Sequence, residues 1–271
     1  MICLTGDVHH SLNSSDQRYI NMSEAEIARD YAEIAQGYGV KVTLFITGKA
    51  FIEDWPHMKG LLEFENVEIG GHTWSAFRPR VLHLAFRLLS GSYYGPSFYQ
   101  RRDITKTLEV IKEKTGEYPV SWRTHAYAAD ARTSTILEKC GIRVASDRVD
   151  RQSLFPCRVG KNLLSLPINV MPDHEHLYHG YRTPKVVARQ KFADSFSDRS
   201  YYINEWFEII RKQIIDIENK KGIATLLVHP ICMKVSDDFK VFEQLCRFLS
   251  AYETILAKDI LELKMKEAQK S

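Results

Sequence analysis

Short apolar runs that alternate with longer amphipathic stretches constrain the fold of this chain most strongly. Seven runs have the length and composition of buried strands, at residues 2–5, 41–46, 67–69, 119–122, 143–146, 163–167 and 224–228. Helical patterns lie between them, such as 24–36 after Ser23, a residue type that caps helix N-termini. This alternation predicts β–α units around a parallel sheet, and 271 residues suit one domain spanning 1–271.

Several of these runs end at side chains that transfer protons or bind metals. The first leads into Asp7 and His9, the third into His72, the fourth into Arg123, and the last into His229. Because the carboxyl ends of parallel barrel strands meet at one edge, we expect these side chains to share a reaction site. The arrangement is typical of an enzyme.

Four motifs in this order resemble those of the polysaccharide deacetylase family (NodB-homology, carbohydrate esterase 4). They are Thr-Gly-Asp-Val-His, Gly-His-Thr-Trp-Ser, Arg-Thr-His-Ala-Tyr and Leu-Leu-Val-His-Pro, and the resemblance extends from Ile2 to about Leu263. It implies a distorted, incomplete (β/α) barrel of about seven parallel strands. It also implies metal-dependent removal of an N-acetyl or related acyl group from a sugar or glycoconjugate, in a variant subgroup that acts in surface-polysaccharide or O-antigen biosynthesis.

The resemblance also implies a role for each residue at the strand ends. Asp7 would be the general base, and His9 would take a ligand position that relatives fill with Asp, since imidazole is a good zinc ligand. Arg123 would orient the Asp7 carboxylate, and His229 would be the general acid. A backbone N–H near Ala126 would stabilise the oxyanion.

The expected ligand set for one divalent ion, zinc by preference, departs from the family at Ala76. His72 matches the first of two family histidines that lie four residues apart on one helical face, but Ala76 stands at the second position. We predict His125 as the substitute ligand. The remaining candidates for this position are His83, His174 and His176.

Residues 76–100 do not fit the β–α pattern. An apolar stretch at 81–89 is flanked by arginines and followed by the aromatic-rich segment 92–99. The simpler interpretation is a short core helix and a turn. The alternative is a flap insertion that contacts substrate or a membrane surface, because basic residues around an apolar face suit a lipid-linked anionic ligand.

The segment 171–179 concentrates three histidines and two acids. It is either a solvated loop or part of the pocket. In the second case Asp173 would support a catalytic side chain, and His174 and His176 would contact metal or sugar.

Composition limits the partners and the location. The chain has 37 Lys and Arg against 34 Asp and Glu, so it offers no electrostatic case for nucleic-acid binding. Five cysteines without Cys-x-x-Cys spacing suggest neither disulfides nor a thiolate zinc site. The start in the first strand, without a basic n-region, predicts a cytoplasmic location and a nucleotide-, lipid- or oligosaccharide-linked substrate.

The sequence is also compatible with two other functions. One is a non-sugar C–N amidohydrolase on the same fold, similar to an allantoinase, which a substrate screen would separate. The other is a metal-free pseudoenzyme that binds carbohydrate, which Ala76 suggests. Metal analysis of protein purified without chelator would distinguish such a pseudoenzyme from a metal-dependent enzyme.

Overall fold

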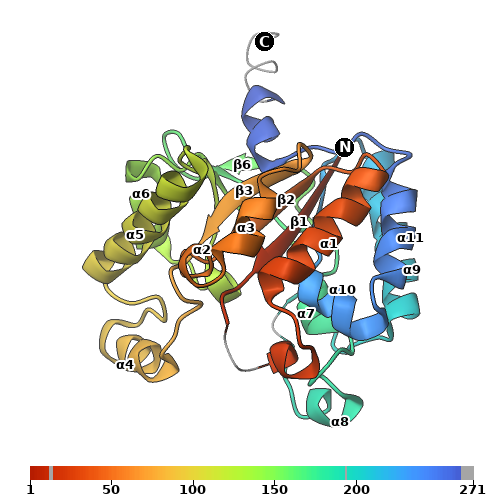
Figure 1. The fold of residues 1–271 in the computed structure, drawn as a ribbon, viewed down its shortest axis with the longest axis horizontal. Coiled ribbons are helices and arrows are strands. Elements are labelled where there is room, and N and C mark those ends of the chain that lie inside the picture. Colours follow the sequence, from red (N-terminus) through yellow and green to blue (C-terminus); the bar gives the residue numbers. More distant parts are fainter. Residues whose placement is uncertain (12–14, 193, 264–271) are drawn as a thin grey trace.

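A curled, mostly parallel sheet forms the centre of the computed structural model, which describes residues 1–11, 15–192 and 194–263 (Figure 1). Its strand order is β6-β7-β5-β4-β3-β2-β1-β8, and β6 alone pairs antiparallel, with β7. The strands are β1 Ile2–Val8, β2 Val42–Ile46, β3 Val67–His72, β4 Ser121–Arg123, β5 Val144–Ala145, β6 Cys157–Arg158, β7 Leu164–Ser165 and β8 Ala224–Leu227.

The predicted fold class, an incomplete (β/α) barrel, is confirmed. Each of the seven predicted strands is present, although β5 and β7 are only two residues long. The sequence reading missed β6, because a two-residue exposed strand leaves no recognisable pattern. The predicted single domain over 1–271 includes residues 264–271, which lie outside the described residues.

Helices pack around the sheet (Figure 1). They are α1 Glu24–Gly37, α2 Ala50–Glu53, α3 Trp55–Leu61, α4 Arg80–Ser90, α5 Ser97–Thr115, α6 Ala131–Lys139, α7 Asp173–His176, α8 Pro184–Val187, α9 Ile203–Asn219, α10 Pro230–Asp237 and α11 Lys240–Leu249, with 3-10 turns η1 Ser15–Tyr19, η2 His125–Tyr127 and η3 Ala257–Asp259. Ser23 caps α1 as predicted, since its Oγ accepts a hydrogen bond from the Glu26 N–H at 3.1 Å.

Strand β1 divides its side chains between two buried environments. Leu4 and Val8 pack into the main core with α1 and α10, whereas Cys3 belongs to a separate cluster with Phe45 inside the curl of the sheet. Because alternate residues of a strand point to opposite faces, Asp7 follows Cys3 onto the inner face. This periodicity directs Asp7 and His9 toward the site.

Two glycines in β3 let the neighbouring strands approach it. A Cβ at Gly70 would lie 2.6 Å from the Phe45 ring, and one at Gly71 would lie 2.5 Å from the Trp122 ring. Only glycine leaves room for both rings. The resulting register pairs His72 with Arg123 at the edge where the site forms.

Helix α4 carries its apolar side chains on the outside of the molecule. It lies at the lower left of Figure 1, away from the central sheet. Val81 is 73% exposed, and Leu88 and Leu89 are each 86% exposed. The predicted helix is therefore present, but it is not a core helix, so the simpler interpretation is wrong. The role of residues 76–100 as a flap stays a prediction.

Within the described ranges, no helix is both long and apolar enough to cross a membrane.

Candidate active site

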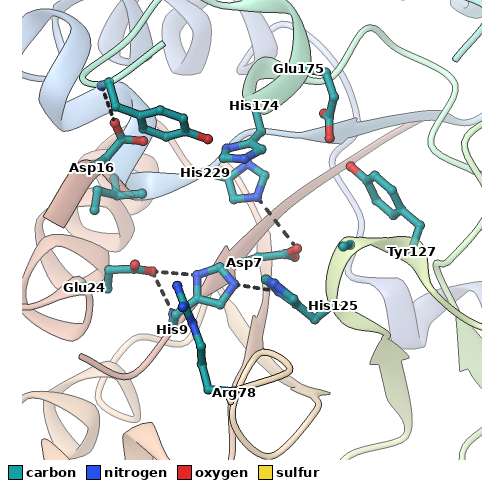
Figure 2. Close-up of a pocket in the computed structure, with 13 residues that line it drawn as sticks. Asp7, His9, Asp16, Glu24, Arg78, His125, Tyr127, His174, Glu175 and His229 are labelled. Atoms are coloured by element: carbon teal, nitrogen blue, oxygen red, sulfur yellow. Dashed lines mark hydrogen bonds and ion pairs between the residues drawn. The ribbon is translucent and has the colours of Figure 1, made fainter. Parts of the chain in front are cut away.

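A cavity of about 330 Å³ opens at the carboxyl ends of the central strands (Figure 2). Four predicted site residues line it: Asp7, His9, His125 and His229. The other lining residues are Asp16, Glu24, Arg78, Ala126, Tyr127, His174, Glu175, Tyr181 and Ile231. His72 and Arg123, both fully buried, contact this group from behind.

Three imidazoles converge beside the cavity. His9 follows β1, His72 ends β3, and His125 begins η2 just after β4. Nδ1 of His125 lies 3.2 Å from Nε2 of His9 and 3.1 Å from Nε2 of His72. Donor nitrogens from all three lie within 4.8 Å of one another.

This cluster fits a divalent metal. A ring nitrogen has either one proton or one lone pair in its plane, so hydrogen bonding alone cannot join His125 Nδ1 to both of the other nitrogens. Two nitrogens bound tetrahedrally to one zinc ion at roughly 2.0–2.1 Å would be roughly 3.3–3.4 Å apart. The observed separations are close to that value.

Burial holds two of the cluster histidines, His72 and His125, in the neutral form that a metal ligand needs. Burial lowers the pKa of His72 to about 3, although the nearby Asp7 carboxylate acts in the opposite direction. Burial also lowers the pKa of His125 well below its usual range, and His9 and His72 lower it further. Both rings are therefore neutral at neutral pH, and each can offer a lone pair to a metal ion.

Glu24 orients the His9 ring. Its Oε2 accepts a hydrogen bond from the His9 backbone N–H at 2.7 Å and lies 3.0 Å from Nδ1 of the same residue. This contact turns Nε2 toward the cluster, as carboxylates often do for histidines that bind metals. The sequence analysis missed Glu24. The sequence feature that could have identified this residue is its place as an acid in the first turn of a capped helix that follows His9.

The expected helical spacing of His72 and Ala76 is wrong. His72 ends a strand, and the following residues form turns, with φ of 44° at Thr73 and 46° at Ala76. The side chain of His125, from the next strand of the sheet, lies against His72 instead. His125 thus stands where we predicted the substitute ligand.

Two of the alternative histidines lie outside the cluster. His83 of α4 is buried, and its Nδ1 lies 3.0 Å from the Tyr93 carbonyl oxygen. Nε2 of His176 contacts the Asp194 carboxylate at 2.8 Å, and its Nδ1 lies 2.9 Å from the Arg199 carbonyl oxygen. These contacts account for both histidines as structural residues.

Arg123 fixes the Asp7 carboxylate in the site. Its Nη1 donates to Asp7 Oδ1 at 2.9 Å, and its Nη2 donates to Thr5 and Ser146 hydroxyls at 2.8 Å each. Burial alone would favour the neutral acid, but Arg123 holds the pKa of Asp7 below its usual range. The free Oδ2 lies 3.9 Å from His72 Nε2 and 3.8 Å from His229 Nε2.

His229 pairs with a buried carboxylate on its far side. Its Nδ1 lies 2.7 Å from Asp173 Oδ1, and its backbone N–H donates to Asp173 Oδ2 at 2.6 Å. Burial by itself would lower the pKa of His229, but Asp173 and then Asp7 raise this pKa to about 9. The imidazole is therefore a proton donor at neutral pH, with Nε2 directed at Asp7 (Figure 2).

The part of the cavity wall that follows His125 contains residues with a left-handed backbone conformation. Ala126 and Tyr127 have φ of 51° and 54°, values that non-glycine residues seldom adopt. Both line the cavity, as does Glu175. Burial raises the pKa of Tyr127 and of Glu175, and the two side chains interact electrostatically. The role of the Ala126 N–H in oxyanion binding stays a prediction.

Comparisons with known proteins agree with this fold. A family model described as polysaccharide deacetylase matches residues 16–145. No curated protein sequence matches the chain. A provisionally named polysaccharide deacetylase from Mycobacterium smegmatis is 18% identical, with a TM-score of 0.70 over 99% of this chain and 90% of that one.

Two further solved structures share the fold with other functions. PuuE allantoinase is 12% identical, with a TM-score of 0.63 over 96% of this chain and 88% of that one. BA3943, a CE4 family pseudoenzyme from Bacillus anthracis, is 15% identical, with a TM-score of 0.52 over 96% and 65% respectively. At these identities the likenesses establish the fold only. Together with the family model they confirm the resemblance seen in the sequence motifs.

Proposed function

We propose that this chain, a divergent member of the polysaccharide deacetylase family, is a metal-dependent hydrolase that removes an N-acetyl or related acyl group from a sugar or glycoconjugate. One observation carries the proposal. A cluster of three imidazoles, an ionised carboxylate held by arginine and a protonated imidazole meet at one cavity. Metal-assisted amide hydrolysis uses these three components.

His9, His72 and His125 would hold the ion, with Glu24 orienting His9. When bound, a divalent metal polarises the amide carbonyl and acidifies a water molecule. Asp7 accepts the proton of the attacking water through Oδ2, since Arg123 occupies Oδ1. Arg123 also keeps that carboxylate ionised and therefore able to act as a base.

His229 then donates a proton to the departing amine from Nε2, the nitrogen that faces Asp7. Asp173 fixes the other ring nitrogen and stabilises the imidazolium. The N–H of Ala126 would stabilise the oxyanion from the strained turn beside His125. The residues of the chain thus supply base, acid and oxyanion contact from separate strand ends.

The substrate would be an N-acylated sugar on a lipid carrier, used in surface-polysaccharide biosynthesis in the cytoplasm. The exposed apolar side chains of α4 and the arginines at its start support a lipid carrier over a nucleotide. Arg78, next to this helix, lines the cavity. The flap 76–100 would therefore bring the lipid-linked sugar to the site.

An amidohydrolase that acts on ureides is the second candidate, because PuuE allantoinase has the same fold. Both activities occur on this fold, so a substrate screen is needed to distinguish them. A metal-free pseudoenzyme is the third alternative, and the convergence of three ligand nitrogens argues against it.

The test combines metal analysis with a substrate screen. Protein purified without chelator should contain zinc, and it should release acetate from N-acetylated sugars but leave allantoin intact. Asp7→Asn should reduce turnover by roughly 10²- to 10⁴-fold, because the proton acceptor is lost. Circular dichroism checks that this variant is folded. Turnover close to wild type in Asp7→Asn, or metal-free protein that stays inert after zinc addition, would contradict the proposal.

A further inference from the structure

A second group of metal-binding side chains lies beside the cavity and has no role in the proposed deacetylation. It consists of Asp16, His174, His179 and Cys232, whose donor atoms lie within 4.8 Å of one another. They come from η1, α7, the loop after α7 and the first turn of α10. His174 and Asp16 also line the cavity.

The distances within this group suit coordination to one ion. Sγ of Cys232 lies 3.9 Å from Nδ1 of His174 and 3.8 Å from Nε2 of His179. A sulfur and a nitrogen bound tetrahedrally to zinc at roughly 2.3 and 2.0–2.1 Å would be roughly 3.6 Å apart. Small side-chain movements would close the difference.

Asp16 completes the arrangement on the far side of His179. Its Oδ2 lies 2.8 Å from Nδ1 of His179, which leaves Nε2 facing Cys232 Sγ at 3.8 Å and the His174 carbonyl oxygen at 3.4 Å. A carboxylate at one imidazole nitrogen commonly orients a histidine whose other nitrogen binds a metal. Asp16, His179 and Cys232 are 2%, 4% and 0% exposed, so the group is held by packing.

We propose that His174, His179 and Cys232 bind a second divalent metal ion of the zinc type, with Asp16 orienting His179. A thiolate with two imidazoles favours zinc or cobalt over magnesium or calcium. His229 does not belong to this site, since carboxylates face both of its ring nitrogens. Three protein ligands leave a fourth position for water or a substrate group.

The proposed site departs from the expectation that the cysteine spacing gave. No Cys-x-x-Cys pair exists, and the sequence therefore suggested no thiolate zinc site. The structure instead combines one cysteine with histidines that lie more than 50 residues away in the chain. A spacing rule cannot detect ligands that only tertiary packing assembles.

Cobalt substitution of the full-length protein tests the site. Chelator-treated protein titrated with Co²⁺ should bind two equivalents and develop a near-ultraviolet charge-transfer band from thiolate to Co²⁺. Cys232→Ser should lose this band and one equivalent. Cys246→Ser is the matched control, because Cys246 is an equally buried free cysteine in α11, outside the group, and it should keep both.

A second variant separates this site from the deacetylase site. His9→Ala should lose the other equivalent but retain the charge-transfer band, so failure of the proposed function would not remove the signal. His174→Gln, at a partly exposed position, replaces Cys232→Ser if that variant does not fold, and it should weaken cobalt binding at this site at least tenfold. Absence of the band in wild-type protein, or its retention in Cys232→Ser, would overturn the proposal.

Discussion

At the scale of single residues, the position of a donor atom matters more than its place in a motif. Ala76 removes a family ligand, yet His125 brings a nitrogen within 3.1 Å of His72 from another strand. Likewise, Asp173, 56 residues earlier in the chain, contacts His229 and raises its pKa. Both roles depend on which side chains the fold brings into contact.

The third ligand is directly testable. His125→Ala should weaken zinc binding by more than the roughly 10- to 100-fold loss that follows removal of an outer partner of a ligand. Ala76→His should not restore binding, because Ala76 is buried in left-handed backbone. Calorimetric zinc titration measures both, with His83→Ala as the control at a buried histidine outside the cluster. Unchanged affinity in His125→Ala would remove it from the ligand set.

The raised pKa of His229 predicts that the rate of deacetylation depends on pH. The pKa of His229 is raised from 6.5 to about 9, so the donor proton is present at neutral pH and lost as the pH rises through about 9. The rate of deacetylation should fall over the same interval. Any stability that this proton contributes is fully present below pH 6.5 and is lost as the pH rises to about 9. Asp173→Asn removes the carboxylate that raises this pKa and should move the alkaline limb to lower pH. An alkaline limb in the kcat/KM profile that Asp173→Asn leaves in place would exclude His229 as its source.

At the scale of elements, α4 departs from the rule that amphipathic helices pack their apolar face on the core. Its stripe of Val81, Leu84 and Leu88 is exposed at helical spacing. The buried His83 holds the helix to the segment that follows it, through the Tyr93 carbonyl. The apolar surface therefore remains available to a lipid while the helix stays in place.

A vesicle assay tests this element. Wild-type protein should co-sediment with phosphatidylglycerol vesicles and much less with phosphatidylcholine vesicles, because apolar burial and basic charge act together. The double variant Leu88→Glu, Leu89→Glu should lose most of this binding but keep activity on a soluble N-acetylated sugar. Ile52→Glu, at an exposed apolar residue of α2, is the control. Equal sedimentation of the double variant and wild type would reject a membrane role for α4.

At the scale of the whole molecule, the sheet holds the site together. The donor nitrogens come from segments that join β1, β3 and β4 to their following helices, and the ion would connect all three. A ligand that binds only the folded state stabilises it by about 2.7 kcal/mol at a free concentration of 100 Kd. Removal of metal should therefore loosen the fold as a unit.

Chelation tests this coupling. EDTA should lower the melting temperature of wild-type protein, and added zinc should restore it. The double variant His9→Ala, His72→Ala should respond less, because only the proposed site at Cys232 would still bind metal, and Cys246→Ser should respond like wild type. Differential scanning fluorimetry measures the shifts. A melting temperature of wild-type protein that is insensitive to both EDTA and zinc would show that the cluster is not a metal site.

The sequence by itself determined seven of the strands and the strand ends at which the candidate site residues lie. Alternation along β1 directs Asp7 and His9 to one face, and the capped helix after Ser23 is equally local. These features depend on the two-residue period of strands, the 3.6-residue period of helices and contacts between residues a few positions apart. A single sequence therefore reveals them.

Tertiary structure alone decided which side chains meet. Glu24 contacts His9, His125 lies against His72, and Cys232 lies close to two distant histidines. Turns such as the one at Ala76 have no period, and each contact depends on the curl of the sheet and on packing between separate elements. Distances of a few ångströms between residues far apart in the chain decide coordination and proton transfer, and only the folded chain sets them.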